Sequence, residues 1–343
     1  MNKVWLTGDA VVDLIPETST TYLKCPGGAP ANVAVGIARL GGDCAFFGRV
    51  GEDPLGRFMH ETLSSEGVDV THLLLDKAQR TSTVLVDLDD TGERTFTFMV
   101  KPSADQFVEK SDVPSFSSDE GIHTCSISLA NEPSRSSTLY ALSSIKAAGG
   151  FISFDPNLRD EIWKDPSEIK DVVMKAVSLA DVVKFSEEEL LFFTDTTDLQ
   201  QGLASIESLN IPLVAITLGA KGALVVFDGK QQIMTGISVG VVDTTGAGDA
   251  FVCGLVAQLA QHSDWKHIDV IEKAIRWGNI CGALATTKKG AMTALPTQQA
   301  LLKLEGIINN TKRIINGIKY LKLNFFIIFF KIYFNIKNTF YFR

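Results

Sequence analysis

Short apolar runs and longer amphipathic patterns alternate along most of this chain, and this alternation restricts its fold more than any other feature. Strands that alternate with helices form mostly parallel sheets with helices on both faces. The chain has 343 residues, 45% of them hydrophobic, enough for the core of one large domain with an accessory element. We therefore expect an α/β fold. The expected strands are 43–48, 121–125, 150–155, 181–185 and 212–217, and the expected helices are 55–66, 134–148, 166–179, 187–193, 248–261 and 268–286.

One region departs from this rhythm. Residues 81–88 and 93–100 alternate apolar and polar side chains on either side of the turn at 89–92, as the strands of a β-hairpin do. Phe96 and Phe98 fall on one face of the second strand, because successive side chains of a strand point to opposite faces. That face lies either toward a ligand or toward the core of the hairpin, and the pattern leaves both open.

A glycine-rich turn lies late in the chain. Residues 243–249 read Asp-Thr-Thr-Gly-Ala-Gly-Asp and lead directly into an apolar, helix-like stretch. Gly246 and Gly248 lack the Cβ atoms that would keep a bulky anion away from the backbone, and the amides of a first helical turn attract anions. Asp249 would repel such an anion, unless it accepts a proton from a hydroxyl that attacks a phosphoryl group held there. The alternative is an ordinary capped loop.

A second glycine-rich segment lies near the N-terminus. Gly27 and Gly28 precede a helix-like run that begins around Pro30 and includes Asn32, whose amide offers both a donor and an acceptor to sugar hydroxyls. Upstream, the apolar run from Val4 ends in Asp9, with Asp13 four residues further on. Acids after a strand lie where open α/β sheets bind ligands. A capped helix with two turn aspartates is the alternative for each residue taken singly.

These two segments, in this order, resemble the two signatures of the ribokinase-like (phosphofructokinase B-type) carbohydrate kinases. The first signature matches 27–51 and the second 243–254, and the resemblance extends from Met1 to about residue 304. Within the family, residues 154–159 with Trp163, and residues 184–189, look most like bacterial fructokinases.

The resemblance implies a three-layer α/β/α domain over residues 1–304, with a mostly parallel sheet and a small β lid built from about 10–25 and 81–105. It also implies an ATP-dependent sugar kinase that phosphorylates the 6-hydroxyl of D-fructose. Kinases for 2-keto-3-deoxygluconate, ribose and aminoimidazole riboside are the alternatives, because substrate choice depends on a few lid and pocket contacts. A non-catalytic sugar or nucleoside sensor is a further alternative, although it would have little reason to keep Asp249 beside an intact anion hole.

The resemblance also implies roles for individual residues. Asp249 matches the general base, the turn of Gly246, Ala247 and Gly248 matches the anion hole, and Arg159 neutralises phosphate charge or reaches the sugar. The residues expected at the sugar are Asp9, Asp13, Gly27, Gly28, Asn32, Phe96, Phe98, Arg159 and Asp249.

The cofactors implied by the resemblance are ATP, Mg²⁺ and K⁺. Glu187 matches the acid that organises magnesium through water, and Lys184 stands where the wider family has Asn, which leaves the arrangement around the metal open. The nucleotide is expected at Lys184, Glu187, Thr217, Gly219, Gly222, Gly246, Gly248 and Asn279. A monovalent cation is expected at Asp243, Thr245 and the carbonyls of Ala285, Lys288 and Gly290, for which a plain loop is the alternative.

Composition restricts the partners. The formal net charge is −8 and there is no basic stripe, which argues against binding to a nucleic-acid backbone. The five cysteines are scattered without paired spacing, which favours reduced thiols in the cytoplasm. The first 20 residues begin with a strand pattern and not with a signal segment.

The lid is a candidate surface for a homodimer.

The last segment, 305–343, differs in character from the rest. From Gly306 onward it has no Asp or Glu and is rich in Lys, Ile, Phe and Tyr. The apolar run at 325–330 stops at Lys331, far short of the ~20 residues that span a bilayer. A basic, aromatic helix at a membrane surface is the alternative. We expect this tail to lie outside the fold.

Overall fold

The structure is a computed structural model and describes residues 2–88 and 94–310. The chain divides into two compact units, 1–298 and 299–343. The larger unit contains the sheets and helices described below.

The core of the first unit is a mostly parallel sheet. Within the described residues it has nine strands in the order β13-β12-β11-β10-β9-β8-β1-β4-β5, and only the pairs β11–β12 and β12–β13 are antiparallel. The bounds are β1 (Val4–Leu6), β4 (Cys44–Gly51), β5 (Asp69–Asp76), β8 (Gly121–Cys125), β9 (Phe151–Asp155), β10 (Val182–Ser186), β11 (Leu213–Thr217), β12 (Gly222–Phe227) and β13 (Lys230–Thr235).

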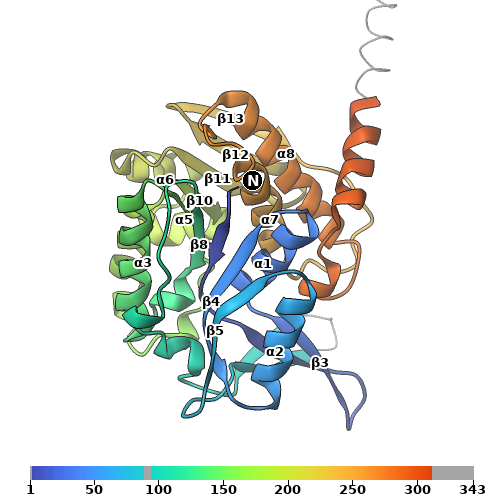
Figure 1. Ribbon diagram of the computed structural model, residues 1–343. Helices are drawn as coiled ribbons and strands as arrows, with labels where there is room; N and C mark the ends of the chain where they lie inside the picture. The colour runs from blue at the N-terminus through green and yellow to red at the C-terminus, as the bar shows by residue number, and fades with distance from the viewer. Residues whose placement is uncertain (1, 89–93, 311–343) are drawn as a thin grey trace, which may run out of the picture. The chain divides into compact units, whose positions relative to one another are not determined.

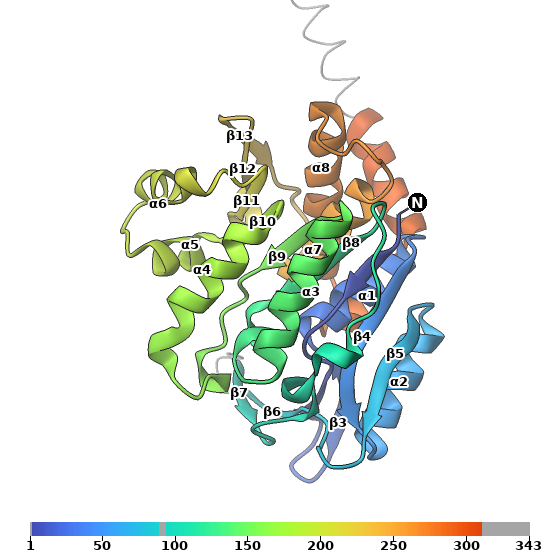
Figure 2. The same cartoon turned by 60° about the vertical axis from the view of Figure 1, so that its left-hand side comes forward.

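Helices cover both faces of this sheet (Figures 1 and 2). On one face, α3 to α6 pack on the apolar side chains of the strands, among them Phe47, Phe154 and Phe185. On the other face lie α1, α7 and α8, and α7 packs against both of the others. The expected three-layer arrangement is confirmed. The bounds are α1 (Ala29–Arg39), α2 (Pro54–Ser65), α3 (Ser134–Ala148), α4 (Ile169–Leu179), α5 (Glu187–Thr194), α6 (Leu199–Ile206), α7 (Ala247–Leu259) and α8 (Ile268–Ala285).

A second sheet forms the expected lid. Among the described residues it has four strands in the order β3-β2-β6-β7, namely β3 (Tyr22–Gly27), β2 (Val11–Pro16), β6 (Thr83–Leu88) and β7 (Arg94–Phe98). Strands β6 and β7 are antiparallel, with Val86 opposite Phe96, as the alternating pattern predicts. The turn at 89–92 lies outside the described residues. A small apolar cluster of Val11, Val84 and Val86 holds the lid together.

The structure differs from the expected elements in a few places. Helix α4 begins at Ile169, because Pro166–Glu168 form a 3₁₀ turn in front of it. Strands β5, β12 and β13 and helix α6 have no counterpart among the expected elements. Five of the six residues of β13 are exposed, so it lacks the apolar run that marks a buried strand.

The second unit is described only over 299–310, which is helical. In the described parts of the chain, every helix is too short or too polar to cross a membrane. The tail assignment at 305–343 falls mostly outside the described residues and stays a prediction.

Candidate active site

The cavity under the lid brings most of the expected site residues together. It has a volume of about 210 Å³ and lies between the lid, the end of β1 and the start of α7. Ile127 and Ala291 also line it, although no sequence motif pointed to them, and so does Asn157, which lies in the fructokinase-like stretch 154–159 but was not expected at the site. The expected residues on its wall are Asp9, Asp13, Gly28, Asn32, Phe96, Phe98, Arg159, Lys184, Thr245, Gly246, Ala247, Gly248 and Asp249.

The glycine-rich turn starts helix α7. Gly246 is the residue before the helix and has a left-handed φ of +73°, which only glycine adopts without strain. A Cβ there would also lie 2.8 Å from the Cβ of Ala291. The amide of Ala247 donates to the carbonyl of Thr244 at 3.2 Å. The amides of Gly248 and Asp249 have no intrahelical carbonyl to bind, and both residues line the cavity. The turn can therefore hold an anion.

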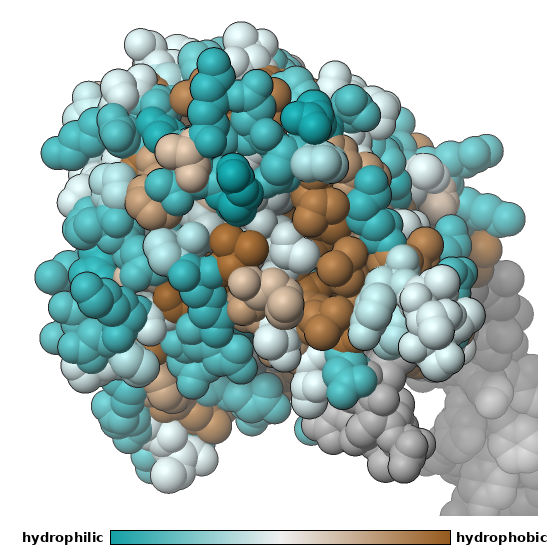
Figure 3. All heavy atoms as spheres, turned by 90° about the horizontal axis from the view of Figure 1, so that it is seen from below, coloured by the Kyte–Doolittle hydropathy of each residue, from teal (hydrophilic) through white to brown (hydrophobic). Residues whose placement is uncertain are grey.

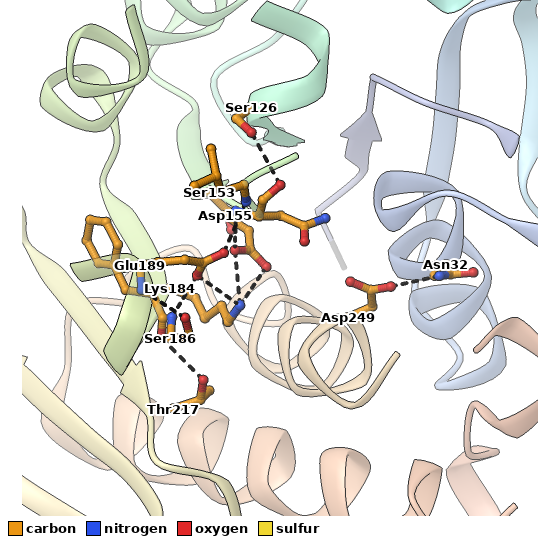
Figure 4. Close-up of polar contacts among 12 residues, drawn as sticks. Asn32, Ser126, Ser153, Asp155, Lys184, Ser186, Glu189, Thr217 and Asp249 are labelled. Atoms are coloured by element: carbon orange, nitrogen blue, oxygen red, sulfur yellow. Dashed lines mark hydrogen bonds and ion pairs between the residues drawn. The ribbon is translucent and has the colours of Figure 1, made fainter. Parts of the chain in front are cut away.

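Asp249 and Asn32 meet across the site. Asn32 Nδ2 donates to Asp249 Oδ2 at 2.7 Å, although the two residues are 217 positions apart (Figure 4). Burial raises the pKa of Asp249, and the hydrogen bond from Asn32 opposes this shift. Asn32 Oδ1 is buried without a hydrogen-bond partner among the described residues. The amide thus orients the carboxylate and still offers one acceptor to a ligand.

Two further carboxylates line the lid side of the cavity. Asp9 follows β1 and is buried, and Cys125 Sγ donates to its Oδ1 at 3.4 Å. Burial and, secondarily, the nearby Asp105 raise the pKa of Asp9 to about 7. Asp13 lies on β2 opposite Cys25. A Cβ on Gly27 would lie 2.6 Å from Asp13 Oδ2, so this glycine leaves room for the carboxylate.

The lid contributes the two phenylalanines. Phe96 and Phe98 both line the cavity, as their shared strand face predicts. Phe98 also packs against the apolar cluster of the lid, whereas Phe96 is 40% exposed. Phe98 thus faces both the cavity and the core of the lid, the two alternatives that the pattern left open.

A buried charged group stands opposite Asp249 (Figure 4). Lys184 Nζ donates to both carboxylate oxygens of Asp155 at 3.1 Å and lies 3.7 Å from Glu189 Oε2. Neither acid was singled out in the sequence as a site residue. Asp155 ends an expected strand, which was a usable signal, whereas Glu189 reads as half of a capping box with Ser186, which it also is.

Two of the expected site residues, Arg159 and Glu187, are exposed. Arg159 lines the cavity from the surface, with its Nη1 donating to the carbonyl of Leu158 at 2.7 Å. Glu187 is the first residue of α5 and is exposed. The carboxylate of α5 that reaches Lys184 belongs to Glu189 and not to Glu187.

The residues expected at the nucleotide lie around the end of β11. Thr217 Oγ1 donates to the carbonyl of Phe185 at 3.3 Å, and the short turn from Gly219 to Gly222 follows. A Cβ on Gly219 would meet no atom of the described residues within 4 Å. Asn279 on α8 donates to the carbonyl of Met234 at 3.1 Å and so ties that helix to β13.

The residues expected at a monovalent cation lie in two adjoining loops. Asp243 Oδ1 accepts from the amide of Thr245 at 3.0 Å, and Asp243 Oδ2 accepts from the amide of Gly290 at 2.8 Å. The carbonyl of Ala285 accepts from the amide of Lys288 at 3.4 Å. These contacts fix the loop beside the anion turn.

The chain is similar to proteins of known activity over most of its length. A family model described as pfkB family carbohydrate kinase matches residues 1–298. The chain is 66% identical over 306 residues to a fructokinase of Vibrio alginolyticus, covering 89% of this chain and 100% of the relative. It is 43% identical over 296 residues to an aminoimidazole riboside kinase of Salmonella typhimurium, covering 86% of this chain and 92% of that relative.

A solved structure has the same fold. It is a fructokinase double mutant from Vibrio cholerae O395 in a form bound to fructose, ADP and potassium ion, with a TM-score of 0.86 and 62% identity, covering 88% of this chain and 98% of the other. The ribokinase-like fold expected from the two signatures is confirmed. With the family model matched over the whole first unit, this chain belongs to the pfkB family of carbohydrate kinases.

Proposed function

We propose that the chain is an ATP-dependent fructokinase that phosphorylates the 6-hydroxyl of D-fructose. The observation that carries the proposal is the buried Asn32–Asp249 hydrogen bond at the start of α7, beside the anion turn. It places a carboxylate of raised pKa next to backbone amides, the pairing that phosphoryl transfer to a hydroxyl requires. The 66% identity to a fructokinase indicates the sugar.

In this proposal Asp249 accepts the proton of the attacking hydroxyl. The amides of the turn Gly246–Gly248 stabilise the negative charge of the transferring phosphoryl group, because they are fixed in place before the reaction. Arg159, at the surface of the cavity, neutralises phosphate charge or contacts the sugar.

The sugar is expected to bind between Asp9, Asp13 and Asn32. Carboxylates accept hydrogen bonds from hydroxyls. Asn32 Oδ1, which has no hydrogen-bond partner within the part of the chain that the structure describes, adds another acceptor. Such a set suits a neutral polyol. A keto-acid sugar would need an additional cation near its carboxylate, and Arg159 on the cavity wall is the candidate for that role.

The nucleotide is expected along Thr217, Gly219, Gly222 and Asn279, where the open face of Gly219 leaves room for it. Glu187 presents an exposed carboxylate that suits a water-bound Mg²⁺, and the bound metal would neutralise phosphate charge. Asp243 and nearby backbone carbonyls are oxygen donors, which hard cations prefer, so these loops fit K⁺.

A substrate panel tests the proposal. We expect kcat/KM with magnesium-ATP to be highest for fructose among fructose, ribose, 2-keto-3-deoxygluconate and aminoimidazole riboside. A clear preference for another sugar would refute the substrate assignment and leave the kinase assignment standing. Absence of ATP turnover with every sugar would favour a sensor.

We also propose that two chains associate through their lids. Tyr22, Leu23 and Met99 lie on or beside the lid strands and are each more than half exposed, at 53%, 53% and 59%. Figure 3 views the lid end of the molecule, where apolar side chains gather, and exposed apolar patches mark interaction sites. Light scattering should report a dimer, and Leu23→Asp should shift it to a monomer; an unchanged mass would refute this interface.

Two further expectations concern location and boundaries. We infer cytoplasmic activity, because the five cysteines, all within the described residues, form no disulfide, and cell fractionation tests it. We also infer that the kinase domain ends near Leu304. A chain ending there should keep kcat and should not differ from the full chain in liposome flotation.

A further inference from the structure

Arg39, the last residue of α1, joins parts of the chain that lie far apart in the sequence. Its Nε and Nη2 donate to the two carboxylate oxygens of Glu66, the residue after α2, at 2.8 and 2.6 Å. Its Nη1 donates to the backbone carbonyls of Met292 and Leu295, at 3.0 Å each. The guanidinium thus fastens the 3₁₀ turn Met292–Ala294 to the C-terminal end of α1.

Glu66 fixes the direction of this guanidinium. Two parallel hydrogen bonds to one carboxylate are the geometry that a planar guanidinium forms best. The hydrogen bond from Arg39 also holds the pKa of the Glu66 carboxyl below its usual range, so both groups are charged at neutral pH. The side chains are 21% and 28% exposed, so water competes little for these contacts. With one edge bound to Glu66, the remaining nitrogen points at the two carbonyls.

The segment that Arg39 holds lies against the anion turn. Ala291, immediately before the 3₁₀ turn, lines the cavity under the lid. A Cβ on Gly246 would lie 2.8 Å from the Cβ and 2.9 Å from the Cα of Ala291, so the two residues pack closely. On the other side, the amide of Gly290 donates to Asp243 Oδ2 at 2.8 Å. Residues 290 and 291 are therefore held from both directions, and Arg39 provides one of the two anchors.

Arg49 offers a comparison within the same chain. It also binds carboxylates, those of Asp76 and Asp112 at 3.0 and 2.7 Å, and its side chain is 18% exposed. Neither acid is among the described residues that line the cavity under the lid. The two arginines thus have similar burial and chemistry, but only the contacts of Arg39 lead to the neighbour of the anion turn.

We propose that Arg39 is a positioning residue for phosphoryl transfer, because its hold on the 3₁₀ turn keeps Ala291 against Gly246 and the amides that follow directed at the cavity. This inference rests on the proposed kinase function. Amides stabilise a transferring group when they are fixed in place before the reaction. Asn32, expected at the sugar, lies at the other end of α1. Arg39 should therefore affect kcat and not the KM for fructose.

The test separates a displaced anion turn from a loss of stability. Arg39→Met, in the full chain, keeps much of the stem and removes the donors. We expect kcat for fructose to fall roughly 10²-fold, as on misplacement of a catalytic group by about 1 Å, with the fructose KM unchanged. Hydrogen exchange at the amides of residues 246–249 should become faster. Arg49→Met is the matched control, which should lower Tm as well but leave kcat and this exchange unchanged.

A kcat in Arg39→Met no lower than in Arg49→Met, or unchanged exchange at residues 246–249, would overturn the proposal. A raised fructose KM with normal kcat would also overturn it, since that result indicates a shift of α1. If Arg39→Met does not fold, Glu66→Gln should show the same pattern at smaller size, and unchanged values there would count against the proposal equally. Lack of kinase activity in the parent chain would instead refute the proposed function, and hydrogen exchange would still test the anchor.

Discussion

Substitution of Asn32 by Ala tests the pairing at the centre of the site. The amide of Asn32 donates to buried Asp249 at 2.7 Å and opposes the rise in the pKa of that carboxyl caused by burial. Without this donor the pKa of Asp249 should rise further. Because the base acts only when deprotonated, the acid limb of kcat/KM should then move to higher pH.

The magnitude follows from the type of hydrogen bond. A hydrogen bond to a charged group contributes about 1.5–3 kcal/mol, which corresponds to roughly a ten- to hundredfold smaller ionised fraction on the acid limb. Loss of the acceptor Asn32 Oδ1 also raises the fructose KM. That second effect lowers the profile at every pH and does not move its limb, so the two losses can be separated.

The assay is kcat/KM for fructose as a function of pH at saturating magnesium-ATP. Asn279→Ala is the matched control, because this amide is also buried but donates to the carbonyl of Met234. It should raise the KM for ATP and leave the acid limb in place. An unmoved limb in Asn32→Ala, or an equal shift in Asn279→Ala, would refute the reasoning.

Four further outcomes are expected. Asp249→Asn should lower kcat by roughly 10²–10⁴-fold, as loss of a general base does, while calorimetry still detects ATP binding. Asp13→Ala should raise the fructose KM through a lost hydrogen bond of about 1–3 kcal/mol, and a raised KM for ATP instead would reverse the assignment of sugar and nucleotide sides. Gly246→Ala should lower both Tm and kcat, because its φ is +73° and a Cβ would lie 2.8 Å from Ala291. The pKa of Asp9 is about 7 in the folded protein against 3.8 for the unfolded group. The folded state therefore favours protonated Asp9, and this contribution to stability is lost as pH rises through 7. Chemical denaturation should find Asp9→Asn more stable than the parent chain at pH 8 and no different near pH 4.

Much of the fold was predictable where burial leaves a pattern in the sequence, although the largely buried strand β12 was missed. The run at 150–155 became β9, and the turn before Ala247 became the start of α7. Strand β13 was not found, because an exposed edge strand such as Lys230–Thr235 has no apolar run. Its place in the sheet comes from pairing with β12, which is a property of the tertiary structure.

The site was predictable residue by residue but not pair by pair. The motifs pointed to Asn32 and Asp249 separately, and nothing in either motif shows that their side chains form a hydrogen bond. The partners of Lys184 were missed for the same reason. Asp155 and Glu189 come from other elements, and Glu189 already has a local explanation as the cap of α5.

The position of the lid in the chain has a consequence for the hydrolysis of ATP by water in place of sugar. Strands β2 and β3 are inserted between Asp9, at the end of β1, and Asn32, in α1. The β2–β3 part of the lid is thus tethered at both ends by residues expected to hold the sugar. We expect a sugar bound by these residues to hold the lid over the anion turn, and a closed site excludes water. We expect futile hydrolysis of the nucleotide to be slow in the absence of sugar for this mechanical reason.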